Sequence, residues 1–194
     1  MTQDTIIALS VLGVVGQVLI AIGLLAGVLA LVGVRGPLDA IRNLLWGYEL
    51  WAAFIVASIA TGGSLFYSQI AHFPPCEFCW FQRVLMYPLS ILTLLIAGRG
   101  DNRTARYLIP LPVVGVGTSI YHILIERGVI AEPKACTASA PGGCAANWIA
   151  PHSFGYLTIP TLALTAFLLL IGFLVLASAG EAEVPATLPA HAER

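Results

Sequence analysis

Charged residues are scarce in this sequence. The 194-residue chain has nine lysines and arginines and ten aspartates and glutamates, together 10% of its residues, whereas 58% are hydrophobic. Soluble domains carry about 25% charged residues, so this composition excludes a soluble globular fold and equally excludes an intrinsically disordered chain. The net charge of −1 leaves no basic footprint, and nucleic acid is therefore not expected as a partner. The composition predicts an integral membrane protein.

Common catalytic motifs are also missing. The sequence has no phosphate-binding P-loop, no Ser-His-Asp pattern and no histidine cluster at metal-ligand spacing, and no metal is expected. A c-type haem is excluded because Trp80 stands where the haem attachment motif needs histidine. Cysteine is rare, with four in the chain: Cys76, Cys79, Cys136 and Cys144.

Long stretches without charge locate the membrane spans. A transmembrane helix needs about 20 mostly apolar residues. The uncharged stretches, and one further apolar stretch with a single arginine, predict an all-α protein with five spans at 6–33, 48–71, 79–98, 107–125 and 154–179. Residues 37–46 predict a short amphipathic helix in the interface. In the first span, Gly23 and Gly27 form a GxxxG motif, which allows close contact with another helix.

Basic residues are distributed unequally between the two sides of the predicted bundle. Two connecting loops on one side hold five of them, and the other side holds two. The first group is Arg35, Arg42, Arg99, Arg103 and Arg106, and the second is Arg127 and Lys134. The positive-inside rule then predicts an extracytoplasmic N-terminus and a cytoplasmic, disordered tail over 180–194. All four cysteines fall on the extracytoplasmic side, where disulfides persist.

The cysteine pair at 76 and 79 carries the most information in the chain. Two prolines precede it, so the next helix is expected to begin at the CxxC, where the positive end of the helix dipole favours thiolate. Arg83 lies four residues beyond Cys79, on the same helical face and one turn inside the apolar slab. A charge inside a membrane by default indicates a function, the alternative being an arginine that snorkels to the headgroups.

His122 and the second cysteine pair lie close to this motif on the same side. At similar depth to Arg83, His122 is expected to form one wall of a polar pocket, unless it is an ordinary packing residue. Cys136 and Cys144 lie in a loop rich in small residues. This pair fits a structural disulfide or a mobile redox pair, whereas an eight-residue offset fits a Cys₄ zinc site poorly.

The segment Pro74-Pro-Cys-Glu-Phe-Cys-Trp-Phe-Gln-Arg-Val-Leu-Met-Tyr-Pro88 resembles the DsbB/BdbC family of disulfide bond formation proteins. Gly63-Ser-Leu-Phe-Tyr-Ser68 and the order of His122 and the later cysteine pair support the resemblance. It implies a four-helix redox bundle over 48–179, preceded by an extra transmembrane helix and connector over 1–47. It also implies a protein dithiol:quinone oxidoreductase that reoxidises a DsbA-like thioredoxin-fold protein. Vitamin K epoxide reductases, in which the loop pair precedes the CxxC, are disfavoured.

The resemblance also assigns roles to individual residues. Cys76 and Cys79 match the pair coupled to the quinone, ubiquinone or menaquinone, with Cys79 next to its ring. Arg83, Gln82 and His122 match the quinone-binding positions. Cys136 matches the cysteine that forms the mixed disulfide with the partner, and Cys144 matches the resolving cysteine.

Two hypotheses follow for the whole chain. The first is an enzyme of the cell membrane that moves electrons from the thiol partner to the quinone pool. The second is a structural or accessory membrane bundle with inert disulfides. Under the first hypothesis we expect the N-terminal helix 6–33 to be dispensable for the chemistry, because it has no ionisable residue and the redox face is complete without it.

Overall fold

The computed structural model describes residues 2–139, 141–149 and 154–182, and most of these are helical. Five helical segments are long and apolar enough to cross a membrane, so the predicted all-helical fold is confirmed. The elements are α1 (Thr2–Leu31), α2 (Gly36–Leu45), α3 (Glu49–Leu65), the π-helical turn η1 (Phe66–Ile70), α4 (Glu77–Arg99), α5 (Asn102–Leu108), α6 (Pro110–Glu126), α7 (Lys134–Ser139) and α8 (Ile159–Ala182).

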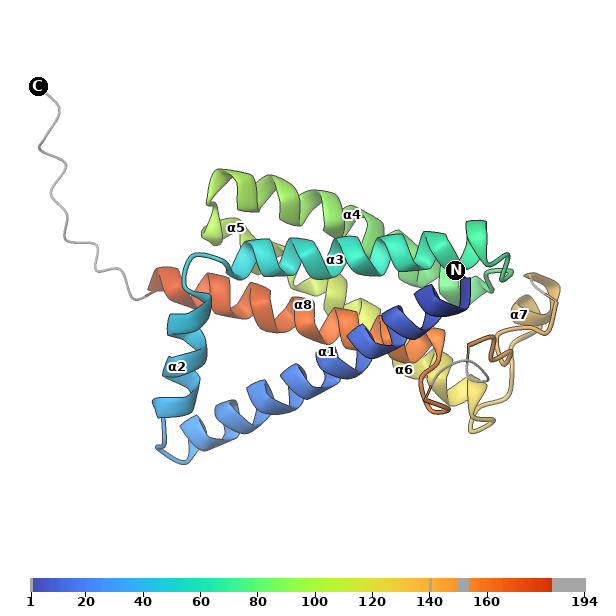
Figure 1. The fold of residues 1–194 in the computed structure, drawn as a ribbon, viewed down its shortest axis with the longest axis horizontal. Helices are drawn as coiled ribbons and strands as arrows, with labels where there is room; N and C mark the ends of the chain where they lie inside the picture. The colour runs from blue at the N-terminus through green and yellow to red at the C-terminus, as the bar shows by residue number, and fades with distance from the viewer. Residues whose placement is uncertain (1, 140, 150–153, 183–194) are drawn as a thin grey trace, which may run out of the picture.

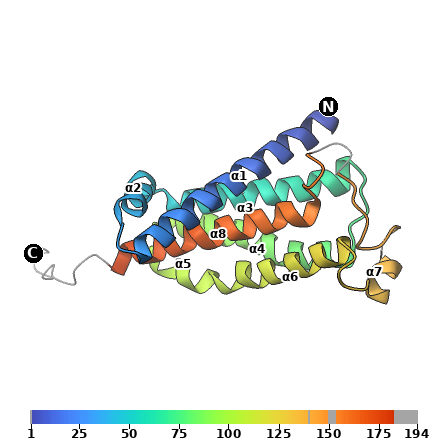
Figure 2. The same cartoon turned by 90° about the horizontal axis from the view of Figure 1, so that it is seen from below.

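Four spans form the bundle, and α1 lies across it. Helices α3, α4, α5 with α6, and α8 run side by side around a core that includes Leu89, Phe167 and Leu170 (Figure 1). Helix α1 crosses α8 obliquely, and the short α2 joins α1 to α3 (Figures 1 and 2). The N-terminal end of α1 and the α7 loop lie at the same end of the bundle.

Local chemistry explains where the spans begin. Helix α4 begins at Glu77, two residues before the predicted start, because Cys76 caps it. Helix α8 begins at Ile159, five residues after the predicted start. There Thr158 and Thr161 exchange side-chain-to-backbone hydrogen bonds of 3.4 and 2.6 Å, the pattern of a capping box.

The remaining boundaries also differ in detail. The fourth span begins at Asn102 and is split at Ile109, because Pro110 has no N–H with which to continue the helical ladder. Helix α2 confirms a helix at 37–46. The predicted tail begins later than 180, since α8 extends to Ala182, and residues 183–194 lie outside the described residues.

The glycine contacts of α1 differ from the prediction. A Cβ added at Gly23 or Gly27 would meet nothing within 4 Å in the described structure, so the GxxxG motif makes no close helix contact here. Instead, a Cβ at Gly13 would clash with Leu162, and one at Gly16 would lie 2.9 Å from Thr165 Cγ2. Small residues about two and three turns nearer the N-terminus than Gly23 therefore allow α1 to pack on α8.

Candidate functional site

The CxxC pair lies at the N-terminus of α4, as the sequence predicts. Cys76 is the N-cap residue, and its sulfur accepts a hydrogen bond from the Cys79 amide at 3.4 Å. The two thiol sulfurs are 3.0 Å apart and are not bonded to each other. A hydrogen bond from the Cys79 thiol, and then one from His122, lower the pKa of Cys76 despite its burial. Cys76 is therefore poised as a thiolate.

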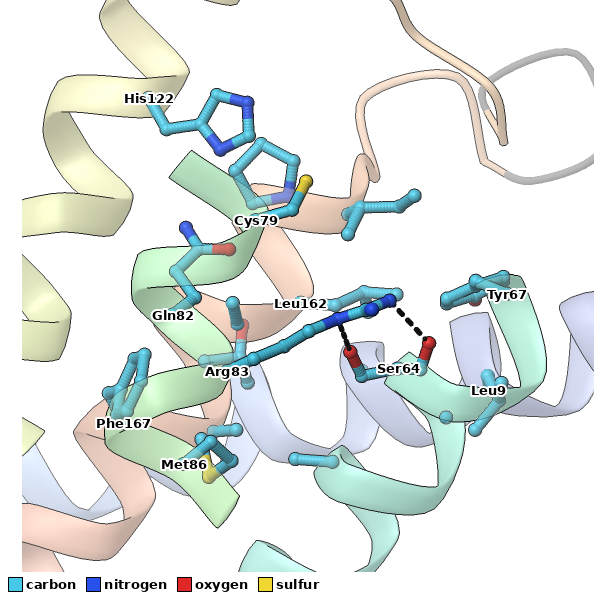
Figure 3. A pocket seen from close by; sticks show the side chains of 18 of the residues that line it. Leu9, Ser64, Tyr67, Cys79, Gln82, Arg83, Met86, His122, Leu162 and Phe167 are labelled. Atoms are coloured by element: carbon cyan, nitrogen blue, oxygen red, sulfur yellow. Dashed lines mark hydrogen bonds between the residues drawn. The ribbon is translucent and has the colours of Figure 1, made fainter. Parts of the chain in front are cut away.

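His122 of α6 connects the two cysteine pairs. Its Nε2 atom is 3.5 Å from Cys76 Sγ and 3.2 Å from the carbonyl oxygen of Cys144. The prediction placed this ring opposite Arg83. Both residues line one cavity, but the direct contact of His122 is with Cys76, because the rotation of α6 turns the ring toward the N-terminus of α4 (Figure 3).

The loop cysteines form a disulfide between Cys136 of α7 and Cys144. Both side chains are buried, at 0% and 2% exposure, in a cluster that also contains Cys76 and Ile125. The disulfide is thus packed against the CxxC, and both interpretations of the pair, structural and redox-active, stay open.

Glu132 fixes the position of this loop. Its carboxylate accepts hydrogen bonds from the backbone amides of Cys144 and Ala145. Charge-assisted bonds of this kind are about twice as strong as neutral ones. The loop therefore has a specific anchor that its Gly/Ala-rich composition does not suggest.

Arg83 is buried one turn further along α4, with 8% of its surface exposed. Its Nε atom donates to Ser64 Oγ and its Nη2 atom to the Ser64 carbonyl oxygen, both at 2.9 Å (Figure 3). The guanidinium also lies over the Trp80 ring, 5.2 Å from its centroid. These three partners are neutral, so they orient the guanidinium without cancelling its charge.

Gln82 lies beside Arg83 on α4 and is also buried. Its side-chain amide donates a 3.2 Å hydrogen bond to Ser119 Oγ of α6. Gln82 lines the same cavity as Arg83, and its amide is held by α6.

A cavity of about 280 Å³ connects these groups. At one end it is lined by Cys76, Cys79, Gln82, Arg83 and His122. Its other walls are mainly apolar and come from α1, α3 and α8. A small polar end beside a large apolar space fits a planar, redox-active head group that carries a hydrophobic tail.

Helix α1 also contributes to the wall of this cavity. Leu9, Leu12, Val15, Gly16 and Leu19 of α1 are among its lining residues. The contribution is apolar surface, which the lack of ionisable residues in α1 does not reveal, and the dispensability of α1 for the chemistry stays a prediction.

Three polar residues of the site were also missed. Ser64 orients Arg83, Ser119 binds Gln82, and Glu126 lines the cavity near the end of α6. Each is a polar residue within or at the end of an apolar span. A polar residue in an apolar span can be recognised in the sequence, but the sequence does not show which residue it contacts.

Comparison with known proteins identifies the family of most of the chain. The family profile described as "Disulfide bond formation protein DsbB" matches residues 48–177. Disulfide bond formation protein C of Bacillus subtilis is 40% identical over 136 residues, which cover 69% of this chain and 95% of that protein. A probable disulfide formation protein of Deinococcus radiodurans is 39% identical over 131 residues, covering 65% of this chain and 86% of its own length. No solved structure gives a significant match.

Proposed function

The chain belongs to the DsbB family of disulfide bond formation proteins, and on this premise we propose that it is a membrane protein dithiol:quinone oxidoreductase. Its role in disulfide formation follows from the family. The proposal adds the direction of electron flow, from a DsbA-like thioredoxin-fold thiol oxidase outside the membrane, through two cysteine pairs, to ubiquinone or menaquinone in the bilayer.

The first steps are thiol–disulfide exchanges. The loop must first open, because Cys136 is buried. A thiolate of the reduced partner then attacks Cys136, which breaks the Cys136–Cys144 bond and forms a mixed disulfide. The second partner thiol resolves it, so the partner leaves oxidised and the loop pair holds two electrons as a dithiol. An interloop disulfide such as Cys76–Cys144 then transfers the oxidising equivalent from Cys76–Cys79 to the loop. The shared contacts of Cys76 and Cys144 with His122 support this pairing.

The CxxC then passes its electrons to the quinone. Cys76 and Cys79 would together give up two electrons and two protons and form their disulfide, and a quinone held in the cavity would supply the acceptor for them. Arg83 stabilises the negative charge that develops in the dry cavity, since its guanidinium is buried and held by neutral partners. His122 lies within hydrogen-bond distance of Cys76 and is suited to moving the thiol proton.

The basic residues of the connecting loops indicate on which side of the membrane this chemistry takes place. The five spans make the chain a multi-pass membrane protein of the same family. We assign the cysteine loops and the N-terminus to the extracytoplasmic side of the cell membrane, and the C-terminus to the cytoplasm, because the basic residues are concentrated in the two opposite loops.

The observation that carries the proposal is a CxxC opening into an apolar cavity next to a buried arginine. The test is stopped-flow oxidation of a reduced thioredoxin-fold partner by the purified protein, with and without added quinone. Without quinone we expect the fully oxidised protein to oxidise at most two equivalents of partner, one for each disulfide, and with quinone we expect continuous turnover. A Cys79→Ser variant should retain the first exchange and lose turnover. Absence of any partner oxidation would leave a structural bundle with inert disulfides.

A further inference from the structure

Helix α1 is the element that the family match leaves unexplained. The matched region begins at residue 48, after α1 and α2. However, α1 supplies six residues to the wall of the cavity that contains Cys79 and Arg83. An added helix therefore borders the site of the proposed electron transfer.

The position of α1 is specified by its contacts and is not a loose association. Gly13 and Gly16 bring its backbone against Leu162 and Thr165 of α8. Gln17 adds two hydrogen bonds, donating to Thr165 Oγ1 at 3.4 Å and accepting from the Tyr156 hydroxyl at 2.9 Å. The N-terminal part of α1 is also anchored by Ile6, which is buried with Tyr67 and Ile149.

The lining of the cavity changes character between its two ends. Cysteine, arginine, glutamine and histidine side chains from α4 and α6 make the polar end. The part beside α1 is lined by Leu12, Val15 and Leu19 of α1, and by Val56 and Ile59 of α3. An apolar cavity wall beside a redox centre suits an alkyl or isoprenoid chain, since burial of each CH₂ group is favourable.

We propose that α1 forms the tail-binding wall of the quinone cavity, holding the first part of the hydrophobic tail between α1, α3 and α8. This inference rests on the proposed quinone reductase function. The helix gives this chain an apolar surface for the tail that lies outside the region matched by the family, and it thereby increases affinity for long-tailed quinones over quinones without a tail.

Two valines of α1 provide a matched test. Val15 lines the cavity and Val18, three residues later, is absent from its lining, although their exposed fractions are similar at 49% and 52%. The variants Val15→Trp and Val18→Trp would be compared by steady-state turnover with a decyl-substituted quinone and with the same quinone ring lacking a tail. The measured quantity is the KM for the tailed quinone divided by the KM for the tail-less quinone. We expect Val15→Trp to raise this ratio by about tenfold, because the tail would lose the burial of one or two methylene groups.

The control and a second variant keep the outcome interpretable. Val18→Trp should leave the KM ratio at its wild-type value. Val15→Ala, which introduces no bulk, should raise the ratio by a smaller factor, about threefold. Single-turnover oxidation of the thiol partner would be measured on each preparation to show that the loop disulfide still reacts.

The outcomes separate this inference from the function on which it rests. An unchanged KM ratio in both Val15 variants, or an equal change in Val18→Trp, would overturn the role of α1 while leaving quinone reduction intact. Failure of the unmodified protein to reduce either quinone would instead overturn the proposed function.

Discussion

Arg83 is held by neutral groups. Its substitution should therefore weaken the stabilisation of negative charge that develops in the cavity, and should leave the fold of the cysteine loop unchanged. For Arg83→Met we expect quinone-dependent turnover to fall about a hundredfold, which corresponds to about 3 kcal/mol for one lost donor in a dry site. Arg83→Lys should recover part of the loss, because its charge remains while the planar fork on Ser64 does not. The measurement is quinone turnover alongside single-turnover thiol exchange. An equal loss in both assays would indicate a folding role for Arg83.

The environment of Cys76 predicts how the reduced protein responds to pH. Its pKa is lowered by the hydrogen bond from Cys79 and then by His122, so the thiolate should persist well below the usual thiol pKa of about 8.5. The thiolate stabilises the reduced fold above the unfolded-state pKa, and this contribution is lost as the pH falls through the lowered value. The pKa of Cys76 is measured by the ultraviolet absorbance of the thiolate during a pH titration. Cys79→Ala should raise the midpoint more than His122→Gln, and no change in either variant would refute the assignment.

The buried disulfide makes a specific prediction for partner exchange. In Cys144→Ala, Cys136 is a free thiol, and its thiolate attacks the disulfide of the oxidised partner, which breaks that bond and forms a mixed disulfide. With Cys144 absent this species should accumulate, whereas Cys136→Ser should abolish partner oxidation. Non-reducing electrophoresis and peptide mapping identify the linked cysteine. A trapped species joined through Cys76 would reverse the roles of the two pairs.

The packing of α1 on α8 can be tested with two glycines of the same helix. Gly13→Leu places a side chain against Leu162 and should destabilise the protein by about 1–3 kcal/mol, the usual cost of overpacking. Gly23→Leu enters open space and should leave the thermal midpoint nearly unchanged. Thermal unfolding in one detergent compares the two variants. Equal midpoints would mean that α1 does not dock on α8 through Gly13.

The orientation of the bundle can be measured in intact cells. Arg103 and Arg127 are both exposed, and each lies at the end of a span on opposite sides of the predicted membrane. In a cysteine-free background, Arg127→Cys should react with a membrane-impermeant maleimide and Arg103→Cys should react only after the cells are opened. Each variant removes one basic residue, and the bias of the loops survives in both. The reverse pattern would invert the bundle and move the cysteine loops to the cytoplasm.

Membrane class, the five spans and the helix that begins after Cys76 could all be predicted from the sequence, because they depend on local hydrophobicity, proline and helix capping. The position of Arg83 one turn beyond Cys79 could be predicted as well, because it depends only on their spacing within one helix. The contact of His122 with Cys76, the Ser64 partner of Arg83 and the burial of Cys136–Cys144 required the three-dimensional structure. These features depend on how each helix is rotated, and spans that are apolar on every side carry no periodic signal that identifies the packed face. The cavity wall formed by α1 could not be predicted for the same reason. The leucines and valines of α1 have the same apolar character in the sequence, and only the packing of α1 on α8 decides that Val15 lines the cavity and Val18 does not.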